Sequence, residues 1–304
     1  MDILILLLTN SVPLLLLISL GYFAGHRFSI DTKTIADIVI FIITPVVVFG
    51  AIARLPLKPE YFLLPLGLFA LAASVTVGMS HFSARFLKDN QSNLIGMGAS
   101  TANTGYFGLP IILALFDPEN AGLYLLMTFA LTINESSFAY YIGARGKHTI
   151  RESVNKVLKL PALYALTLGL AVNIAGIELP GIFNIYWDKF AGAWTILGMM
   201  LLGVALSRHK VTTNWTLLGW FTAIKFILWP GIMLGLIAMD RHFFHLYEPK
   251  IHTMLLVIGC LPLAANLVAF ATQLDVKPGE ASIIVLITTI IGVFYIPLML
   301  YLFS

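Results

Sequence analysis

Charge and cysteine are both scarce in this chain. Asp, Glu, Lys and Arg together make up 11% of the 304 residues, whereas hydrophobic residues make up 59%. Soluble domains carry charge on about a quarter of their residues, so the composition excludes that class and predicts a polytopic membrane protein. The single cysteine, Cys260, has no second cysteine to pair with, which excludes an internal disulfide and a cysteine-based metal site. We expect it to be a small packing residue.

Motifs for catalysis, metals and cofactors are also missing. The apolar stretches contain no HExxH sequence, no paired-aspartate motif and no nucleophile with a base nearby. His242 and His245 are three apart but have no further ligands around them. The net charge of +3 comes from basic residues scattered in short loops without interleaved aromatics, which does not indicate nucleic-acid binding. We therefore predict a protein that is not an enzyme, needs no cofactor or metal and does not bind nucleic acid.

Long apolar stretches are what the chain does have. A helix needs about 20 mostly apolar residues to cross a bilayer. We predict ten spans, at residues 3–23, 34–53, 61–86, 92–116, 121–144, 160–177, 187–206, 215–239, 251–274 and 279–303. The first has neither a basic segment before it nor a convincing cleavage site, so we expect it to be retained as a span. No loop is long enough for a second soluble domain.

The segment at residues 145–159 is the longest and most basic connection. With this segment in the cytoplasm, twelve Lys and Arg residues lie inside and five outside, so the positive-inside rule predicts both termini in the periplasm. Five spans on each side of it make equivalent spans run in opposite directions, as an inverted repeat requires. We expect a first repeat at 1–144, a basic linker that touches anionic head groups at 145–159, and a second repeat at 160–304. Leu109-Pro110 and Leu261-Pro262 are sequence echoes between the repeats.

Two of the predicted spans carry helix-breaking residues at their centres. Residues 100–110 read STANTGYFGLP, and residues 261–266 read LPLAAN. Because hydrocarbon offers the backbone no hydrogen bonds, such a break survives only where it is buried in protein or lines a watered cavity. Paired interruptions in corresponding positions indicate the binding site of a secondary transporter. The other interpretation is that each proline only kinks a packing helix.

The first break also carries a recognisable pattern. Its residues Asn103, Gly105, Tyr106, Gly108 and Pro110 are spaced N-x-G-Y-x-G-x-P and precede an apolar half-helix. This pattern closely resembles the fourth helix of the auxin efflux carrier family of prokaryotic and plant transporters, and the second break resembles that family's ninth helix. The similarity covers the whole chain and includes Thr44-Pro45, Gly198 and Gly203, which we expect to serve close helix packing and bending.

The resemblance implies both a fold and a mechanism. The fold would be all-α, with ten transmembrane helices in two inverted five-helix repeats whose broken helices 4 and 9 cross. Helices 1, 2, 6 and 7 would form a scaffold, and helices 3–5 and 8–10 would form an elevator-type transport domain that exposes the substrate alternately to each side. Members of the family carry auxin in plants and are linked to malonate and other carboxylates in bacteria. The short central connection here favours a prokaryotic carboxylate carrier of the inner membrane over an auxin carrier.

The two asparagines beside the breaks are the main candidates for substrate binding. Asn103 and Asn266 each offer two donors and one acceptor, so their amides, together with the amides of the half-helices, could hold a carboxylate. Their alternative role is to cap the broken backbone. Phe107 and Tyr106 would shape an apolar wall or simply pack. The candidate substrate-binding residues are Asn103, Thr104, Gly105, Tyr106, Gly108, Pro110, Pro262 and Asn266.

Two charged residues lie deep in predicted spans, Glu135 in the fifth and Lys225 in the eighth. A central charge costs about 2.5–3.5 kcal/mol on insertion scales, so it normally faces a partner or a cavity. Lys225 either attracts the substrate anion or titrates during the cycle, or else it is a counter-ion or snorkels to the surface. Glu135 either carries a coupling proton or neutralises Lys225. The sequence leaves open whether the two residues meet.

Together these features predict a secondary transporter of a small organic anion, with the lipid bilayer as its environment and a homodimer left open. The alternative is a sodium- or proton-coupled symporter or antiporter of the bile-acid or sodium/proton exchanger type. Such carriers usually place acidic residues at the crossover, whereas Glu135 is on the next helix, so we expect passive anion transport or proton coupling rather than sodium coupling. A receptor would keep the same binding residues, and an intramembrane enzyme would need motifs that the chain lacks.

Overall fold

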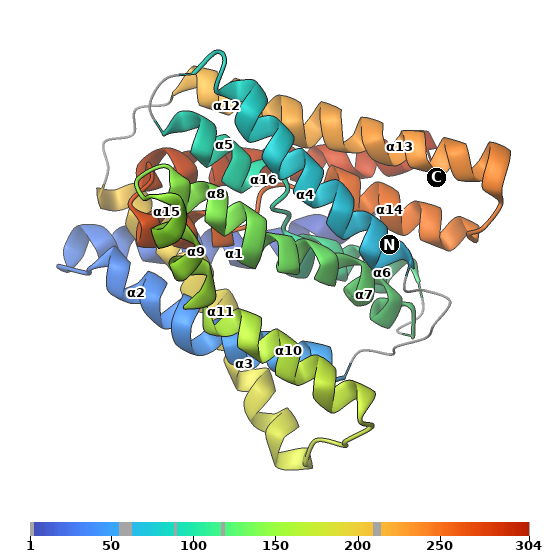
Figure 1. The fold of residues 1–304 in the computed structure, drawn as a ribbon, viewed down its shortest axis with the longest axis horizontal. Helices are drawn as coiled ribbons and strands as arrows, with labels where there is room; N and C mark the ends of the chain where they lie inside the picture. Colours follow the sequence, from blue (N-terminus) through green and yellow to red (C-terminus); the bar gives the residue numbers. More distant parts are fainter. Residues whose placement is uncertain (1–2, 55–62, 88–89, 117–118, 209–213, 304) are drawn as a thin grey trace.

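A computed structural model describes residues 3–54, 63–87, 90–116, 119–208 and 214–303. Throughout these ranges the regular structure is helical and no strand occurs (Figure 1). The α-helices are α1 (Ile3–Arg27), α2 (Thr32–Ile38), α3 (Thr44–Ala53), α4 (Leu63–Ser83), α5 (Gln91–Ala99), α6 (Leu109–Leu115), α7 (Glu119–Asn134), α8 (Tyr140–Arg145), α9 (Ile150–Leu158), α10 (Pro161–Ile174), α11 (Gly181–Arg208), α12 (Trp215–Ala223), α13 (Trp229–Met239), α14 (Pro249–Cys260), α15 (Asn266–Leu274) and α16 (Pro278–Phe303). Five π-helical stretches join or extend them: η1 (Val39–Ile43), η3 (Thr104–Gly108), η4 (Glu135–Ala139), η5 (Ile224–Leu228) and η6 (Asp240–Phe244).

Three of the π-helical stretches have a simple cause in the sequence. η1, η3 and η5 are each followed directly by a residue and a proline, at Pro45, Pro110 and Pro230. A proline inside a helix has no N–H to donate, and its ring clashes with the carbonyl four residues before it. The wider π turn relieves that conflict without ending the helix. η4 has no such proline after it, and π bulges of this kind are frequent at functional sites.

Several helices are long and apolar enough to cross a membrane. Within the described residues there are five, at Thr32–Ala53, Leu63–Ser83, Gly181–Arg208, Trp215–Phe244 and Pro278–Phe303. A sixth results if α9 and α10, bent by 47° at their junction, are taken together. The predicted spans at 92–116, 121–144 and 251–274 are each divided into shorter helices. The described part of the chain is therefore all-helical, and its several apolar helices indicate a multi-pass membrane protein. The count of ten spans stays a prediction.

The helix pair α1 and α11 packs at very short range. A Cβ atom on Gly203 of α11 would lie 1.9 Å from the carbonyl oxygen of Ile18, and one on Gly21 of α1 would lie 2.2 Å from that of Met200. Only glycine permits backbones to approach so closely, which confirms the expected packing role of Gly203. The same expectation is wrong for Gly198, because a Cβ there would meet no atom within 4 Å; this residue lies on a different face of α11.

The remaining helices pack around these. α10 lies along α3, and α3 also contacts α11, whereas α4 packs on α5 and α7, and α13 packs on α14. α16 contacts α1 and α11 as well as α14 and α15 (Figure 1). It therefore links the helix pair α1 and α11 to the helices on either side of the second break. The division into scaffold and transport domains, and the repeat boundaries at 144 and 160, stay predictions.

The basic linker is helical over α9. A capping box formed by Thr149 and Glu152 begins this helix. Ile150, Val154 and Leu158 recur every four residues and are 61%, 42% and 54% exposed. An amphipathic helix with an unburied apolar stripe and basic neighbours suits the membrane–water interface.

Candidate functional site

The first break is shorter than the sequence pattern suggested. α5 ends at Ala99 and a helical backbone resumes at Thr104, where the amides of Phe107 and Gly108 donate to the carbonyl of Asn103 at 3.3 and 3.2 Å. Only residues 100–103 are irregular, so the glycines of the motif lie in helical backbone. Pro110 is already the second residue of α6, and the side chains of Tyr106 and Pro110 lie outside the described part of the structure.

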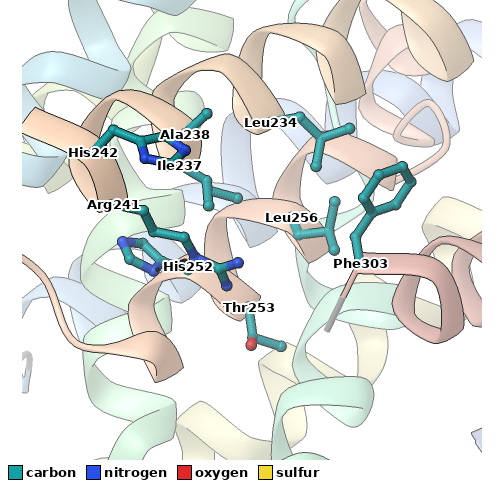
Figure 2. A pocket seen from close by; sticks show the side chains of 9 residues that line it. All are labelled: Leu234, Ile237, Ala238, Arg241, His242, His252, Thr253, Leu256 and Phe303. Carbon is teal, nitrogen blue, oxygen red and sulfur yellow. Dashed lines mark hydrogen bonds between the residues drawn. The ribbon is translucent and has the colours of Figure 1, made fainter.

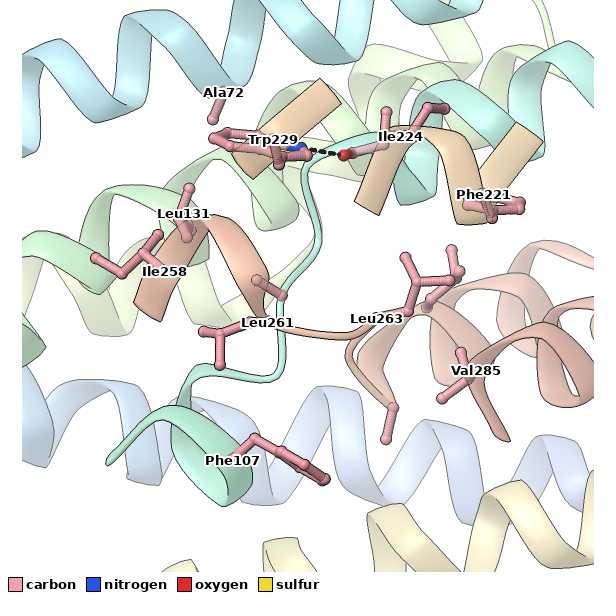
Figure 3. Close-up of a cluster of buried hydrophobic side chains, with 14 of the residues drawn as sticks. Ala72, Phe107, Leu131, Phe221, Ile224, Trp229, Ile258, Leu261, Leu263 and Val285 are labelled. Carbon is pink, nitrogen blue, oxygen red and sulfur yellow. Dashed lines mark hydrogen bonds between the residues drawn. The ribbon is translucent and has the colours of Figure 1, made fainter. Parts of the chain in front are cut away.

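The second break crosses the first. α14 ends at Cys260, α15 begins at Asn266, and the amide of Asn103 donates to the carbonyl of Pro262 at 2.9 Å. Figure 3 shows the two irregular segments passing over one another, with Leu261 and Leu263 on the second of them. Pro262 lies inside its break whereas Pro110 lies beyond its own. The two prolines of the Leu-Pro echo therefore lie at different places relative to their breaks, and the inverted repeat stays a prediction.

One peptide group of the first break is held between two opposite charges. The ammonium of Lys225 donates to the carbonyl oxygen of Thr101 at 2.9 Å. The amide of Ala102, which belongs to the same peptide group, donates to Oε1 of Glu135 at 3.3 Å. Lys225 is 1% exposed and Glu135 is 4% exposed, and no direct ion pair joins them among the described residues. The two charged groups therefore lie at opposite ends of the dipole of this one peptide group, which we call the clamped peptide.

Glu135 also reaches the second break. Its Oε2 accepts a hydrogen bond from Nδ2 of Asn266 at 3.1 Å, so one carboxylate contacts both breaks. The expectation that Glu135 lies away from the crossover because it is on the next helix is wrong. The π-helical stretch η4 begins at Glu135, and an altered helical register of this kind cannot be read from residue spacing.

The end of α5 is capped by side chains from other helices. Nε1 of Trp229 donates to the carbonyl of Ala99 at 2.6 Å (Figure 3). Asn134 donates from Nδ2 to the hydroxyls of Ser100 at 2.5 Å and Thr76 at 3.0 Å, and all three residues are fully buried. The last carbonyls of a helix have no partners within it, so these contacts satisfy polar groups that could not reach water. Neither Trp229 nor Asn134 was expected from the sequence, although the polar run at 134–137 was a usable signal.

The half-helix after the first break is partly accessible. Thr104 and Gly105 are half-buried, and the carbonyl of Thr104 accepts from the hydroxyl of Tyr124 at 3.0 Å. A Cβ on Gly108 would lie 1.7 Å from that hydroxyl, so glycine is needed there. A Cβ on Gly105 would meet only the ring of Trp194, at 3.9 Å. A methyl group at Gly105 would thus fit in ordinary van der Waals contact with Trp194 of α11, whereas a larger side chain would press against that ring.

The polar groups described above all lie at the crossing of the two breaks. Asn103 is buried at the crossing, and Asn266 is half-buried with one donor on Glu135. Pro262 supplies the carbonyl that joins the breaks. No three His, Cys, Asp or Glu side chains come together in the described ranges, so the polar chemistry of the crossing is that of amides, one carboxylate and one ammonium.

A family model described as Membrane transport protein matches residues 146–300, just over half of the chain. This chain belongs to that family, the auxin efflux carriers. The resemblance noted in the sequence is therefore confirmed, although the matched region begins after the motif of the first break.

Relatives of this auxin efflux carrier family member span almost its full length. It is 25% identical over 298 residues to "Uncharacterized transporter YfdV" of Escherichia coli (strain K12), covering 90% of this chain and 91% of the relative. It is 24% identical over 291 residues to "Uncharacterized transporter MJ1031" of Methanocaldococcus jannaschii, covering 90% and 92%. A "Putative malonate transporter" of Rhizobium meliloti is 21% identical over 312 residues, covering 96% and 94%. The chain is thus a multi-pass membrane transport protein.

Proposed function

We propose that this protein is a secondary transporter that carries a small organic anion, such as a carboxylate or dicarboxylate, across the cell membrane by alternating access. The observation that carries the proposal is the crossing itself. Two broken helices meet at Asn103 and Pro262, and one buried carboxylate contacts both. A soluble-protein core has no need of such a break, whereas broken helices at membrane depth are the usual binding sites of secondary transporters. The name of the Rhizobium relative favours a dicarboxylate such as malonate.

The substrate would bind where the crossing is least buried. Thr104, Gly105 and Asn266 are half-buried, and the positive end of the half-helix that starts at Thr104 lies there. Neutral amides would hold the carboxylate, so release stays possible on the other side. Trp194 would form the facing wall. Asn103 and Asn266 would act as site members. The alternative role of Asn266 as a helix cap is wrong, because Ala265 precedes α15 without a side-chain hydrogen bond and the side-chain amide of Asn266 donates to Glu135 instead.

The wider architecture belongs to the same proposal. We infer ten spans in two inverted repeats, a scaffold of helices 1, 2, 6 and 7, and a moving domain of helices 3–5 and 8–10, with both termini in the periplasm. The packing of α1 on α11 and of α3 on α10 supports the scaffold. Both broken spans fall in the moving domain, which would carry the site across the membrane.

Proton coupling is favoured over sodium coupling by the clamped peptide. Sodium, like other hard cations, needs several oxygen ligands, but the carbonyl of Thr101 already accepts from the ammonium of Lys225. Glu135 is the group able to take up a proton. Protonation would weaken the hydrogen bonds that Glu135 accepts from the amide of Ala102 and from Asn266. The contact between the two breaks would then be weaker. Glu135 would therefore link proton uptake to movement.

Uptake into proteoliposomes tests the proposal. Labelled malonate, succinate, acetate and indole-3-acetate would be supplied with and without pH and sodium gradients. We expect saturable uptake of one acid, driven by a pH gradient or by no gradient. Gly105→Val should abolish uptake because its methyl groups would press on Trp194 at the proposed site, whereas Gly67→Val, at an exposed position with open space around it, should not.

Other outcomes would change the conclusion. Uptake that depends on sodium would contradict the assigned role of Lys225. Binding of an acid to the purified protein without accumulation in vesicles would indicate a receptor instead of a transporter. Equal uptake by Gly105→Val and the wild type would show that the substrate does not bind at the start of the half-helix.

A further inference from the structure

A pocket of about 310 Å³ lies at the end of α14 opposite the second break. Helices α13, α14 and α16 and the stretch η6 surround it (Figure 2). Its walls are mostly apolar, and its polar side chains gather toward η6 and the start of α14. The lining residues are Leu234, Ile237, Ala238, Arg241, His242, His252, Thr253, Leu256 and Phe303.

A chain of hydrogen bonds from the buried side chains of Asp240 and His252 holds the guanidinium of the exposed Arg241 at this pocket. The carboxylate of Asp240 accepts from the amides of Leu246 and Tyr247 at 3.0 and 3.2 Å and lies 2.8 Å from Nε2 of His252. Nε of Arg241 donates to Nδ1 of His252 at 3.3 Å. Because Nδ1 accepts, His252 carries its proton on Nε2 and donates it to Asp240. Asp240 is thereby satisfied within the protein and does not compete for the guanidinium.

The other end of the guanidinium faces the pocket. Figure 2 places it between Leu256 and Thr253, beside the imidazole of His252. The hydrogen bond to His252 uses only Nε, and across the described residues the terminal N–H groups of Arg241 donate to no protein acceptor. Four preorganised donors at a planar fork match the oxygens of a phosphate. His242, at the same end of the pocket, can add another donor.

The position of the pocket suits one kind of phosphate. Arg241 lies near the end of the apolar segment Trp215–Phe244, where a membrane-spanning helix reaches the head groups. The neighbouring Phe243 and Phe244 are 77% and 57% exposed, and apolar rings of this kind insert at the boundary between head groups and acyl chains. A cavity of this volume is at the small end of ligand pockets, so it can hold an acidic head and the start of a chain but no complete lipid. The rest of the chain would lie along the exposed rim at Phe303.

We propose that this pocket binds the phosphate of an anionic phospholipid on Arg241, with the start of one acyl chain against Leu234, Leu256 and Phe303. The site is separate from the crossing and does not depend on what the protein transports. α14 connects the two, since it begins at the pocket and ends at the second break. A bound lipid would therefore anchor the first turns of α14, whose last residue, Cys260, leads into the second break.

Native mass spectrometry of the full chain with added dioleoyl phosphatidylglycerol tests the proposal. We expect Arg241→Gln to weaken binding of the first lipid about 10-fold or more, since a hydrogen bond to a charged group contributes about 1.5–3 kcal/mol. Ala238→Phe should weaken it similarly by filling the pocket while leaving Arg241 in place. Lys189→Gln removes the same charge from an exposed position on α11 and should leave binding unchanged.

Two further ligands identify what the pocket recognises. Dioleoyl phosphatidylcholine has the same chains but no net charge, and we expect it to bind at least 10-fold more weakly. Glycerol phosphate, which lacks chains, should not bind measurably. Equal binding by Arg241→Gln and the wild type, or equal binding of phosphatidylcholine, would overturn the proposal. Tight binding of glycerol phosphate would assign the pocket to a soluble phosphate and would equally overturn the lipid assignment.

Discussion

The two breaks that cross at the centre of this protein are held in place by different forces. In the first, the peptide group between Thr101 and Ala102 lies between the charges of Lys225 and Glu135. The second is built of Leu261, Pro262, Leu263 and two alanines, with both leucines fully buried. One break is fixed by electrostatics in a low-dielectric interior, and the other by close packing.

This difference suggests which break can change during a transport cycle. Apolar packing cannot be altered by a proton or an anion, whereas a clamp of two charges responds to either. The contact between Glu135 and Asn266 joins the charged break to the packed one. We therefore expect the first break to respond to ligand and proton, and the second to follow it.

Removal of one charge from the clamp should have the largest effect. Lys225→Met leaves the carboxylate of Glu135 buried without its counter-charge, and breaking a buried pair in this way costs about 3–5 kcal/mol. We expect a large fall in the thermal unfolding temperature of the purified protein. Lys225→Met combined with Glu135→Gln should recover much of that stability, because no buried charge remains, but it should not recover uptake.

The double variant decides whether the two charges act on one another through the clamped peptide. If it is as unstable as the sum of the two single variants, the charges are independent, and the clamp has no role in holding the first break.

Overpacking the second break should have a smaller effect. A Cβ on Gly292 of α16 would lie 3.1 Å from the ring of Pro262. Gly292→Val should therefore push against the break and destabilise the protein by about 1–3 kcal/mol, measured by thermal unfolding. Gly198→Val introduces the same side chain where a Cβ meets nothing within 4 Å. A matching loss in both variants would contradict the packing explanation.

The smallest expected effect is at the end of α5. Trp229→Phe removes the N–H that caps the carbonyl of Ala99, a change of about 1 kcal/mol for one hydrogen bond. Trp187→Phe removes a similar bond to the carbonyl of Val47, between α11 and α3. We expect similar losses of stability in the two variants but slower uptake only in Trp229→Phe. Reduced uptake in both would mean that the end of α5 has no special link to transport.

Parts of the crossing could be predicted from the sequence because they depend on local chemistry. Clustered proline, glycine and small polar residues within an apolar stretch favour an interruption of the helix, so both breaks could be predicted. Their extent was not, because three π-helical stretches absorb a proline without ending the helix, and Pro110 is one of those prolines. The roles of Trp229 and Asn134 were missed because their partners are backbone carbonyls and hydroxyls on distant helices.

The sequence by itself determined three things about this protein. Its composition indicates a helical membrane protein, the motif at residues 103–110 indicates the auxin efflux carrier family, and the helix-breaking residues indicate two interrupted helices. Each of these depends on composition or on the chemistry of a few neighbouring residues. Only the tertiary structure decided that Glu135 belongs to the crossing and that Lys225 meets it through one peptide group. Glu135 lies 33 positions after Ala102, and Lys225 lies 124 positions after Thr101 and 90 after Glu135. Such separations cannot be foreseen from the sequence, because a charge inside the membrane is stabilised by whichever polar group the fold places next to it.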